Sequence, residues 1–127
     1  MKYLLDTNII IDHLRERKIL SEDFLILGAG ISIITFGELI YGAYKSDDPQ
    51  KSLQKLDNSL RILNLEIVNL NLEVMSEFSR IKAELERKGE RIEDFDLLIA
   101  ATAKVNGFIL ITRNKKHFER IPDLRLG

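Results

Sequence analysis

The sequence predicts an α/β fold of three layers (α/β/α), in which a mostly parallel sheet lies between two layers of helices. Two observations predict this class. Short apolar runs without polar alternation recur along the chain, as expected for strands buried on both faces. Helical patterns lie between these runs, and strands that alternate with helices typically form parallel sheets.

Four apolar runs are the candidate strands. They cover residues 3–5, 31–34, 67–68 and 108–111. Three of them end in a polar residue, namely Asp6, Thr35 and Thr112, whereas the run at 67–68 is shorter and weaker. Each is too short for a buried helix and rich in β-branched or leucine side chains, which favours strands.

Three helical patterns separate the strands. Leucines at 53, 56, 60 and 63 are spaced three, four and three residues apart, and the apolar residues at 74, 78, 81 and 85 follow the same period. Gly89 is placed to end the second of these helices. Residues 97–105 are apolar almost throughout and stop at Asn106-Gly107, so we expect this helix to be the buried one.

The composition is that of an ordinary globular protein. Of the 127 residues, 45% are hydrophobic and 31% are charged, and no linker or repeat divides the chain, so we expect one domain over residues 1–127. The absence of cysteine excludes disulfides and thiolate metal sites.

No signal peptide or membrane-spanning run is present in the sequence, and we therefore expect a cytoplasmic protein without membrane contact. The net charge of −1 excludes no class of enzyme, because an acidic pocket and a basic rim cancel in the sum.

Four polar side chains fall where predicted strands end or helices begin. Asp6 directly follows the first strand, Glu38 lies four residues after the second, Asp96 opens the apolar helix and Asn114 follows the fourth strand. The carboxyl ends of parallel strands meet at one edge of the sheet, where binding sites form. We therefore expect these side chains to share a pocket.

Each of these residues also has a structural explanation. Asp6 suits the N-cap of the helix that follows it. The segment Thr35–Glu38 fits a T-x-x-E capping box. Asp94 and Asp96 suit the positive end of a helix dipole, and Asn114 is a good N-cap for the segment after it. Taken singly, each acid is more often a cap than a functional group.

Taken together, the acids favour a metal site. Carboxylates held in one pocket repel each other and destabilise the fold unless something neutralises them. Mg²⁺ takes one or two carboxylates directly and keeps several waters. Such waters can be activated as nucleophiles, and the cation can stabilise charge on an attacked phosphate.

Four segments of the sequence resemble the motifs of PIN domains, and in particular of VapC-type toxins of toxin–antitoxin pairs. They are Leu5–Asn8, Ser32–Gly42, Asp96–Ala103 and Leu110–Phe118. They occur in the family's order and cover nearly the whole chain. The resemblance implies a PIN-like three-layer fold.

The resemblance also assigns site residues. Asp6, Glu38 and Asp96 fall on the family's metal-binding acids, which hold Mg²⁺ or Mn²⁺. Asn114 falls where many members carry a fourth acid, and an amide there brings no charge, so we expect one tightly bound ion and leave a second in doubt. Asp94 is the alternative ligand if Asp96 turns inward as a cap.

Three further polar residues are expected to orient the ligands and water by analogy with the family. These are Thr7, Asn8 and Thr112.

The reaction that the resemblance implies is hydrolysis of an RNA phosphodiester by metal-activated water, which leaves 5′-phosphate and 3′-hydroxyl ends. The sequence offers no plausible catalytic histidine pair, since His13 and His117 both lie among charged residues and are expected to face solvent.

Basic residues after the fourth strand are candidate phosphate contacts. They are Arg113, Lys115, Lys116 and Arg120. An ordinary solvated face explains them equally well, because Glu119 interrupts the run.

The resemblance further implies a homodimer and a VapB-like antitoxin partner. The helix at residues 36–44 is apolar on more than one face, which is compatible with an interface.

Three other classes of protein are alternatives to an active PIN-domain nuclease. A receiver-like signalling module expects paired acids after strand one and an aspartate after a central strand, but Asn69 follows residues 67–68. A dehalogenase-like phosphatase requires D-x-D after strand one, and Asn8 stands in place of the second acid. A catalytically degenerate PIN domain is suggested by Asn114, although the other three acids are present.

Overall fold

The fold is built on a parallel sheet of four strands, described by a computed structural model of residues 2–127, apart from the side chain of Leu25. In spatial order the strands are β3 (Glu66–Val68), β2 (Ala29–Ser32), β1 (Tyr3–Leu5) and β4 (Ile109–Ile111). All neighbouring pairs are parallel, with Leu4 opposite Gly30 on one side and Leu110 on the other. The predicted parallel sheet is confirmed.

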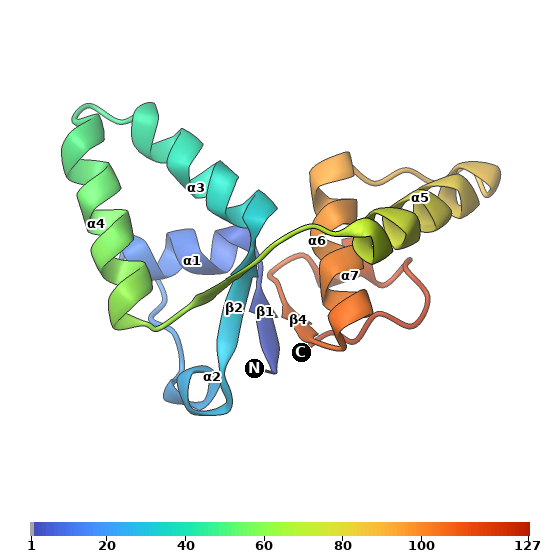
Figure 1. The fold of residues 1–127 in the computed structure, drawn as a ribbon, viewed down its shortest axis with the longest axis horizontal. Coiled ribbons are helices and arrows are strands. Elements are labelled where there is room, and N and C mark those ends of the chain that lie inside the picture. The colour runs from blue at the N-terminus through green and yellow to red at the C-terminus, as the bar shows by residue number, and fades with distance from the viewer. Residues whose placement is uncertain (1) are drawn as a thin grey trace.

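Seven helices are described around the sheet. They are α1 (Thr7–Leu14), α2 (Glu22–Leu27), α3 (Ile33–Tyr44), α4 (Pro49–Ile62), α5 (Leu72–Arg87), α6 (Asp94–Asn106) and α7 (Lys115–Phe118). Figure 1 shows α1, α3 and α4 on one side of the sheet and α5, α6 and α7 on the other. Within the described residues, none of these helices combines the length and apolarity needed to cross a bilayer.

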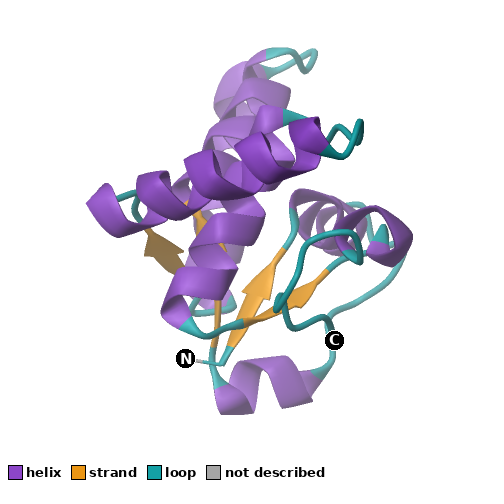
Figure 2. Cartoon of the chain, turned by 90° about the vertical axis from the view of Figure 1, so that its right-hand side faces the viewer, coloured by secondary structure: helices purple, strands orange, loops and turns teal. Residues whose placement is uncertain are grey.

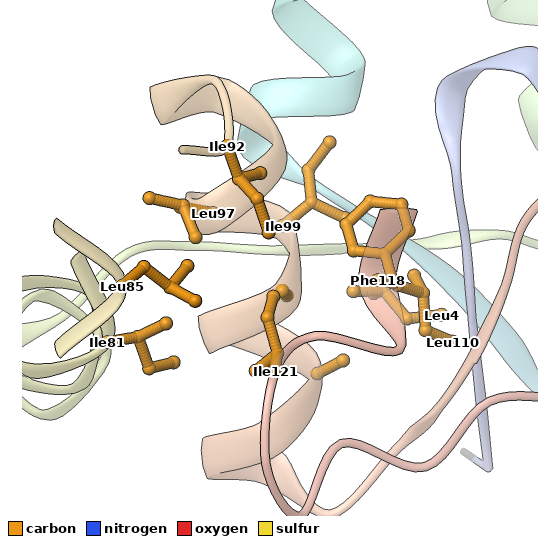
Figure 3. Close-up of a cluster of buried hydrophobic side chains, with 11 residues drawn as sticks. Leu4, Ile81, Leu85, Ile92, Leu97, Ile99, Leu110, Phe118 and Ile121 are labelled. Carbon is orange, nitrogen blue, oxygen red and sulfur yellow. The ribbon is translucent and has the colours of Figure 1, made fainter. Parts of the chain in front are cut away.

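The side chains of the central strands alternate between two hydrophobic clusters. Leu4 and Leu110 point into a cluster with residues of α5, α6 and α7, part of which is drawn in Figure 3. Their neighbours Leu5 and Ile111 point into a second cluster with residues of α1, α3 and α4. A strand that is buried on both faces needs apolar residues at every position, which is why the runs show no alternation. The three-layer prediction is confirmed, and Figure 2 shows helices over both faces of the strands.

Helix α6 is the buried helix that its apolar sequence predicts. Every residue from Leu97 to Ala103 is buried, and its alanines allow close packing against α5 and β4. Gly107 ends the helix in a left-handed conformation, with φ of 71°. That backbone conformation is disfavoured for residues with a Cβ, which explains the Asn-Gly stop.

The predicted boundary between the second strand and its helix is wrong by two residues. The strand covers Ala29–Ser32 rather than 31–34, and α3 begins at Ile33. The Ser32 hydroxyl accepts a hydrogen bond from the Thr35 amide at 3.0 Å, so Ser32 is the N-cap. The predicted capping box from Thr35 to Glu38 is therefore wrong, and Glu38 lies in the second turn of α3.

The short helix α2 was not predicted by any sequence pattern. It has six residues, begins after the N-cap Ser21 and exposes Ile26. The predicted helices over 53–63 and 74–85 exist but are longer than their apolar patterns, since α4 starts at Pro49 and α5 at Leu72. The first turn of α4 is polar and extends this helix beyond its buried face.

Replacement of Ser32 by alanine should test the position of this helix start. The change removes the acceptor for a buried amide, and we expect it to lower the free energy of unfolding by about 1–2 kcal/mol, measured by urea denaturation. Ser21→Ala, which removes an exposed cap from the short α2, serves as the control and should cost less. An unchanged stability of Ser32→Ala would contradict the assigned N-cap.

Candidate active site

A cleft of about 780 Å³ lies at the carboxyl end of the sheet, where α1 and α3 begin, and extends to the first turn of α6. The predicted polar residues that line it are Asp6, Thr7, Asn8, Glu38, Asp96 and Asn114. Figure 1 shows the starts of α1 and α3 at one end of the strands, beside the upper part of α6. The topology therefore brings together acids that are far apart in the sequence.

Asp6 is fixed by hydrogen bonds to both of its oxygens. Oδ1 accepts from the Thr7 amide at 2.8 Å, and Oδ2 accepts from the Thr112 hydroxyl at 2.8 Å. The side chain is only 6% exposed although it lines the cleft. The cap that the sequence suggested for Asp6 is present, and the same carboxylate also faces the cleft.

Glu38 is held by a hydroxyl network that crosses between two helices. The Thr7 hydroxyl donates to Glu38 Oε1 at 2.6 Å and lies 3.1 Å from the Thr35 hydroxyl. Thr35 in turn approaches the Ser32 cap of α3. Thr7 therefore orients the Glu38 carboxylate, while the predicted role of Thr35 as a cap is not found.

Burial and mutual repulsion raise the pKa values of two of these acids. Desolvation raises the pKa of Glu38, a hydrogen bond from Thr7 opposes the rise, and the charges of Asp6 and Asp96 add to it. Desolvation also raises the pKa of Asp96, followed by the charge of Asp6, whereas the contact with His117 lowers it. The three carboxylates are thus electrostatically coupled within one desolvated region.

Asp96 lies against a histidine that the sequence analysis placed in solvent. His117 Nε2 is 3.3 Å from Asp96 Oδ2, and its side chain is only 22% exposed. Arg120, a predicted phosphate contact, instead lies 3.0 Å from His117 Nδ1 and donates to the carbonyl of Arg91. The solvent-facing prediction for His117 is wrong because Asp96 and Arg120 lie on either side of its ring.

The alternative ligand Asp94 has a cationic partner beside the cleft. Asp94 Oδ1 is 2.9 Å from Lys82 Nζ on α5, and Asp94 does not line the cleft with Asp6, although it lines a neighbouring hollow with Glu38 and Asp96. Neither Asp94 nor Asp96 caps α6, since its N-cap is Glu93, without a side-chain cap bond. The geometry favours Asp96 over Asp94 as the site residue.

The fourth predicted position is neutral and begins the short helix α7. Asn114 is the N-cap residue of α7, as predicted, although its side chain makes no cap hydrogen bond. Its backbone amide donates to the Thr112 hydroxyl at 3.0 Å, which links it to Asp6 through Thr112. The side-chain amide of Asn114 makes no cap bond and therefore remains available to the cleft.

The basic residues after β4 do not line the cleft. Arg113 pairs with Asp12 at 3.2 Å, and Lys115 and Lys116 are exposed on α7. None of the three lines the cleft among the residues described. Their predicted contact with phosphate stays a prediction.

The cleft also has apolar walls that the sequence analysis did not identify. Phe95 is 55% exposed and Tyr41 is 63% exposed, and both line the cleft beside Asp96 and Glu38. Position alone could have indicated them, since Phe95 directly precedes Asp96 and Tyr41 lies three residues after Glu38 on the same helix face.

The carboxylates are near one another but not closely gathered. Within the described part of the chain, no three acid, histidine or cysteine side chains converge to the distances of a metal site. Glu38 is turned toward Thr7 and Asp96 toward His117, which keeps the two like charges apart.

Comparison with known proteins identifies the family. The PIN domain model matches residues 3–124, so the chain belongs to the PIN domain family. The match covers nearly the whole chain and leaves the receiver-like and phosphatase-like interpretations without support. Both the recognised motifs and the predicted fold class are confirmed.

The curated relatives are VapC ribonucleases. The chain is 36% identical to the tRNA(fMet)-specific endonuclease VapC of Salmonella typhimurium, over 99% of this chain and 96% of that protein. It is 37% identical to ribonuclease VapC2 of Haemophilus influenzae, over 98% of this chain and 96% of that protein. Ribonuclease VapC1 of Methanocaldococcus jannaschii is 38% identical over 98% of this chain and 85% of its own length.

Solved structures of VapBC complexes have the same fold. The VapBC2 complex of Rickettsia felis, bound to a DNA fragment from its promoter, matches with a TM-score of 0.90 and 35% identity over 100% of this chain and 98% of that chain. The DNA-bound VapBC of Salmonella typhimurium matches with a TM-score of 0.91 and 34% identity, over 100% and 97%.

The raised pKa of Glu38 predicts a pH-dependent stability of the metal-free protein. Between the unfolded value near 4.5 and the raised folded value, the folded state binds more protons, so stability falls as the pH rises through this window. In chelator, Glu38→Gln should therefore gain in melting temperature relative to the parent between about pH 4 and pH 7, by on the order of 2 °C.

The control for this experiment is Glu86→Gln, which removes an exposed carboxylate of α5. Its melting temperature should keep a constant difference from that of the parent. If the difference for Glu38→Gln were equally constant across the pH range, the electrostatic coupling inferred for the cleft would be wrong.

Proposed function

We propose that this chain is a Mg²⁺- or Mn²⁺-dependent endoribonuclease, with its single PIN domain as the toxin of a VapBC-like toxin–antitoxin system. One observation supports the site above all others. Acids near the cleft have cationic partners, Arg113 for Asp12 and Lys82 for Asp94. Within residues 2–127, Asp6, Glu38 and Asp96 form no ion pair with lysine or arginine.

The chemistry of the donor set fits a hard divalent cation. The oxygen ligands come from Asp6 at the end of β1, Glu38 on α3 and Asp96 on α6, and no thiolate is present in the sequence. The excess negative charge that raises the pKa values of Glu38 and Asp96 is what a cation would neutralise. When bound, the cation would supply Lewis acidity at a phosphate oxygen and a polarised water.

The chain's own groups have distinct tasks in this proposal. Asp6 is a fixed anchor because both of its oxygens accept hydrogen bonds. The Thr7 hydroxyl uses one lone pair of Glu38 Oε1, so the other lone pair would remain for the cation and Oε2 can take a proton from the attacking water. Water attacks phosphorus, the bond from phosphorus to the 3′ oxygen breaks, and that oxygen takes a proton from solvent. The products are a 5′-phosphate and a 3′-hydroxyl. Asn8 and Asn114 provide neutral donors and acceptors at the rim.

Charge-removing substitutions should abolish cleavage without unfolding the protein. We expect Asp6→Asn, Glu38→Gln and Asp96→Asn each to lower the RNA cleavage rate by more than about 100-fold, because loss of a ligand should exceed the 10–100-fold cost of losing its supporting contacts. Asparagine also caps helices well, so α1 should survive the change at position 6. Cleavage of labelled RNA, with and without EDTA, measures the effect.

Asp94→Asn is the matched control, since it lies two residues from Asp96 but pairs with Lys82 outside the cleft. Its cleavage rate should stay within a few-fold of the parent, on the scale of an exposed ion pair. Metal-dependent cleavage that survived in Asp96→Asn but not in Asp94→Asn would reverse the assignment. A parent protein without cleavage activity would support the degenerate alternative.

The partners follow from the same assignment. Structures of relatives contain a VapB protein together with VapC, and we infer a VapB-like antitoxin for this chain. We also infer a homodimer, for which the exposed Tyr41 and Tyr44 of α3 provide apolar surface. Lys115 and Lys116 are exposed on α7 next to Asn114, where they can contact RNA phosphates.

Expression in a bacterial host should separate toxin and antitoxin. The chain alone is expected to stop growth, whereas Asp96→Asn should not. Co-expression of the antitoxin encoded beside it should restore growth and give a complex that copurifies. Sequencing of RNA 5′ ends shortly after induction identifies the cleaved RNA, and normal growth with intact RNA would contradict the toxin assignment.

A further inference from the structure

The imidazole of His117 lies against the carboxylate of Asp96. Its Nε2 lies 3.3 Å from Asp96 Oδ2, is fully buried, and has no hydrogen-bond partner of good geometry among the residues described. A buried ring nitrogen without a partner is costly, so such an atom requires an explanation. The nearest acceptor is the Asp96 carboxylate.

Arg120 determines which nitrogen of this ring carries the proton. The Arg120 guanidinium can only donate hydrogen bonds, and its Nη2 lies 3.0 Å from His117 Nδ1. Nδ1 must therefore accept, and the single proton of the neutral imidazole is on Nε2, which faces Asp96. A protonated Nε2 is a hydrogen-bond donor and cannot ligate a metal through that atom.

The arginine is itself held by two further contacts. Its Nη2 also donates to the Arg91 carbonyl at 3.1 Å, and its Nε donates to the His117 carbonyl at 3.2 Å. The next residue, Phe118, is fully buried in the cluster of Figure 3 and packs edge-on against the His117 ring at 5.4 Å. The ring is thus fixed between the core, the end of α7 and the loop before α6.

We propose that His117 is a positioning residue that donates from Nε2 to Asp96 Oδ2, with Arg120 fixing its tautomer, so that Oδ1 of Asp96 is presented to the cleft. This inference rests on the proposed function, because it concerns how one of the proposed metal ligands is oriented. The distance of 3.3 Å between the two atoms is just above the usual N–H···O range of about 2.7–3.2 Å. A hydrogen bond from a residue outside the ligand set orients a carboxylate for its cation.

The tautomer can be measured without metal or substrate. Long-range ¹H–¹⁵N NMR spectra of the metal-free protein at roughly pH 8, above the usual histidine pKa, should show His117 protonated on Nε2 and not on Nδ1. Arg120→Met should lose this preference and populate both tautomers. A parent protein with the Nδ1–H tautomer would overturn the proposal.

Metal binding provides the second measurement. Calorimetry with Mg²⁺ alone and with Mn²⁺ alone compares His117→Leu, which cannot donate, with His117→Gln, whose amide can. Affinity for both ions should fall by about 10–100-fold in the leucine variant and be largely restored in the glutamine variant. His13→Gln is the matched control, because His13 only accepts from the Leu20 amide, and it should bind like the parent.

The outcomes distinguish this proposal from the proposed function. A loss in His117→Leu that is much larger for Mn²⁺ than for Mg²⁺ would indicate direct ligation by the imidazole and would overturn the positioning role. Unchanged affinity in a leucine variant with parental melting temperature would also overturn it. A parent protein that bound neither ion would overturn the proposed function, whereas the tautomer measurement would still decide whether His117 donates to Asp96.

Discussion

The structure around the cleft depends on one constraint, the repulsion among three carboxylates in a desolvated region. Burial and mutual charge raise the pKa values of Glu38 and Asp96. Hydroxyl groups hold two of the three, since Thr112 donates to Asp6 and Thr7 donates to Glu38, while Asp96 lies 3.3 Å from His117 Nε2. Hydroxyl donors fix directions but leave the net charge in place. The protein thus keeps a negative pocket at a cost in stability that a cation would offset.

The sheet topology explains why these acids meet. In a parallel sheet every strand points its carboxyl end at the same edge, and β1 and β2 are adjacent in the order β3-β2-β1-β4. Asp6 and the helix of Glu38 therefore follow neighbouring strands. The sequence was sufficient to predict this much, because apolar runs without alternation identify buried strands and the polar residues after them are few. The buried helix α6 was predictable for a similar reason, since the chain from Leu97 to Ala103 has no polar face to expose.

The errors arise where a tertiary contact outweighs a local pattern. Ile33 and Ile34 suit a strand, but the Ser32 hydroxyl accepts from the Thr35 amide and starts the helix earlier. His117 lies between charged residues in the sequence, yet Phe118 anchors the short α7 in the core and turns the histidine toward Asp96. No local signal shows that Arg91 and Arg120 meet, because 29 residues separate them. Spacing predicted which side chains share an edge, and the family resemblance indicated Thr7 and Thr112 as orienting residues. Neither indicated that His117 meets Asp96.

The distribution of charge around the cleft also favours one direction of approach for the substrate. The negative side chains come from the end of β1, α3 and α6, whereas the uncharged residues Asn114 and Phe118 line the cleft on the α7 side. A fourth acid at position 114 would repel a phosphate there, and an amide does not. Lys115 and Lys116 follow directly on the exposed surface of α7. An RNA phosphate can therefore enter along α7 with the least repulsion and meet the carboxylates only on the opposite wall, where a cation would shield them.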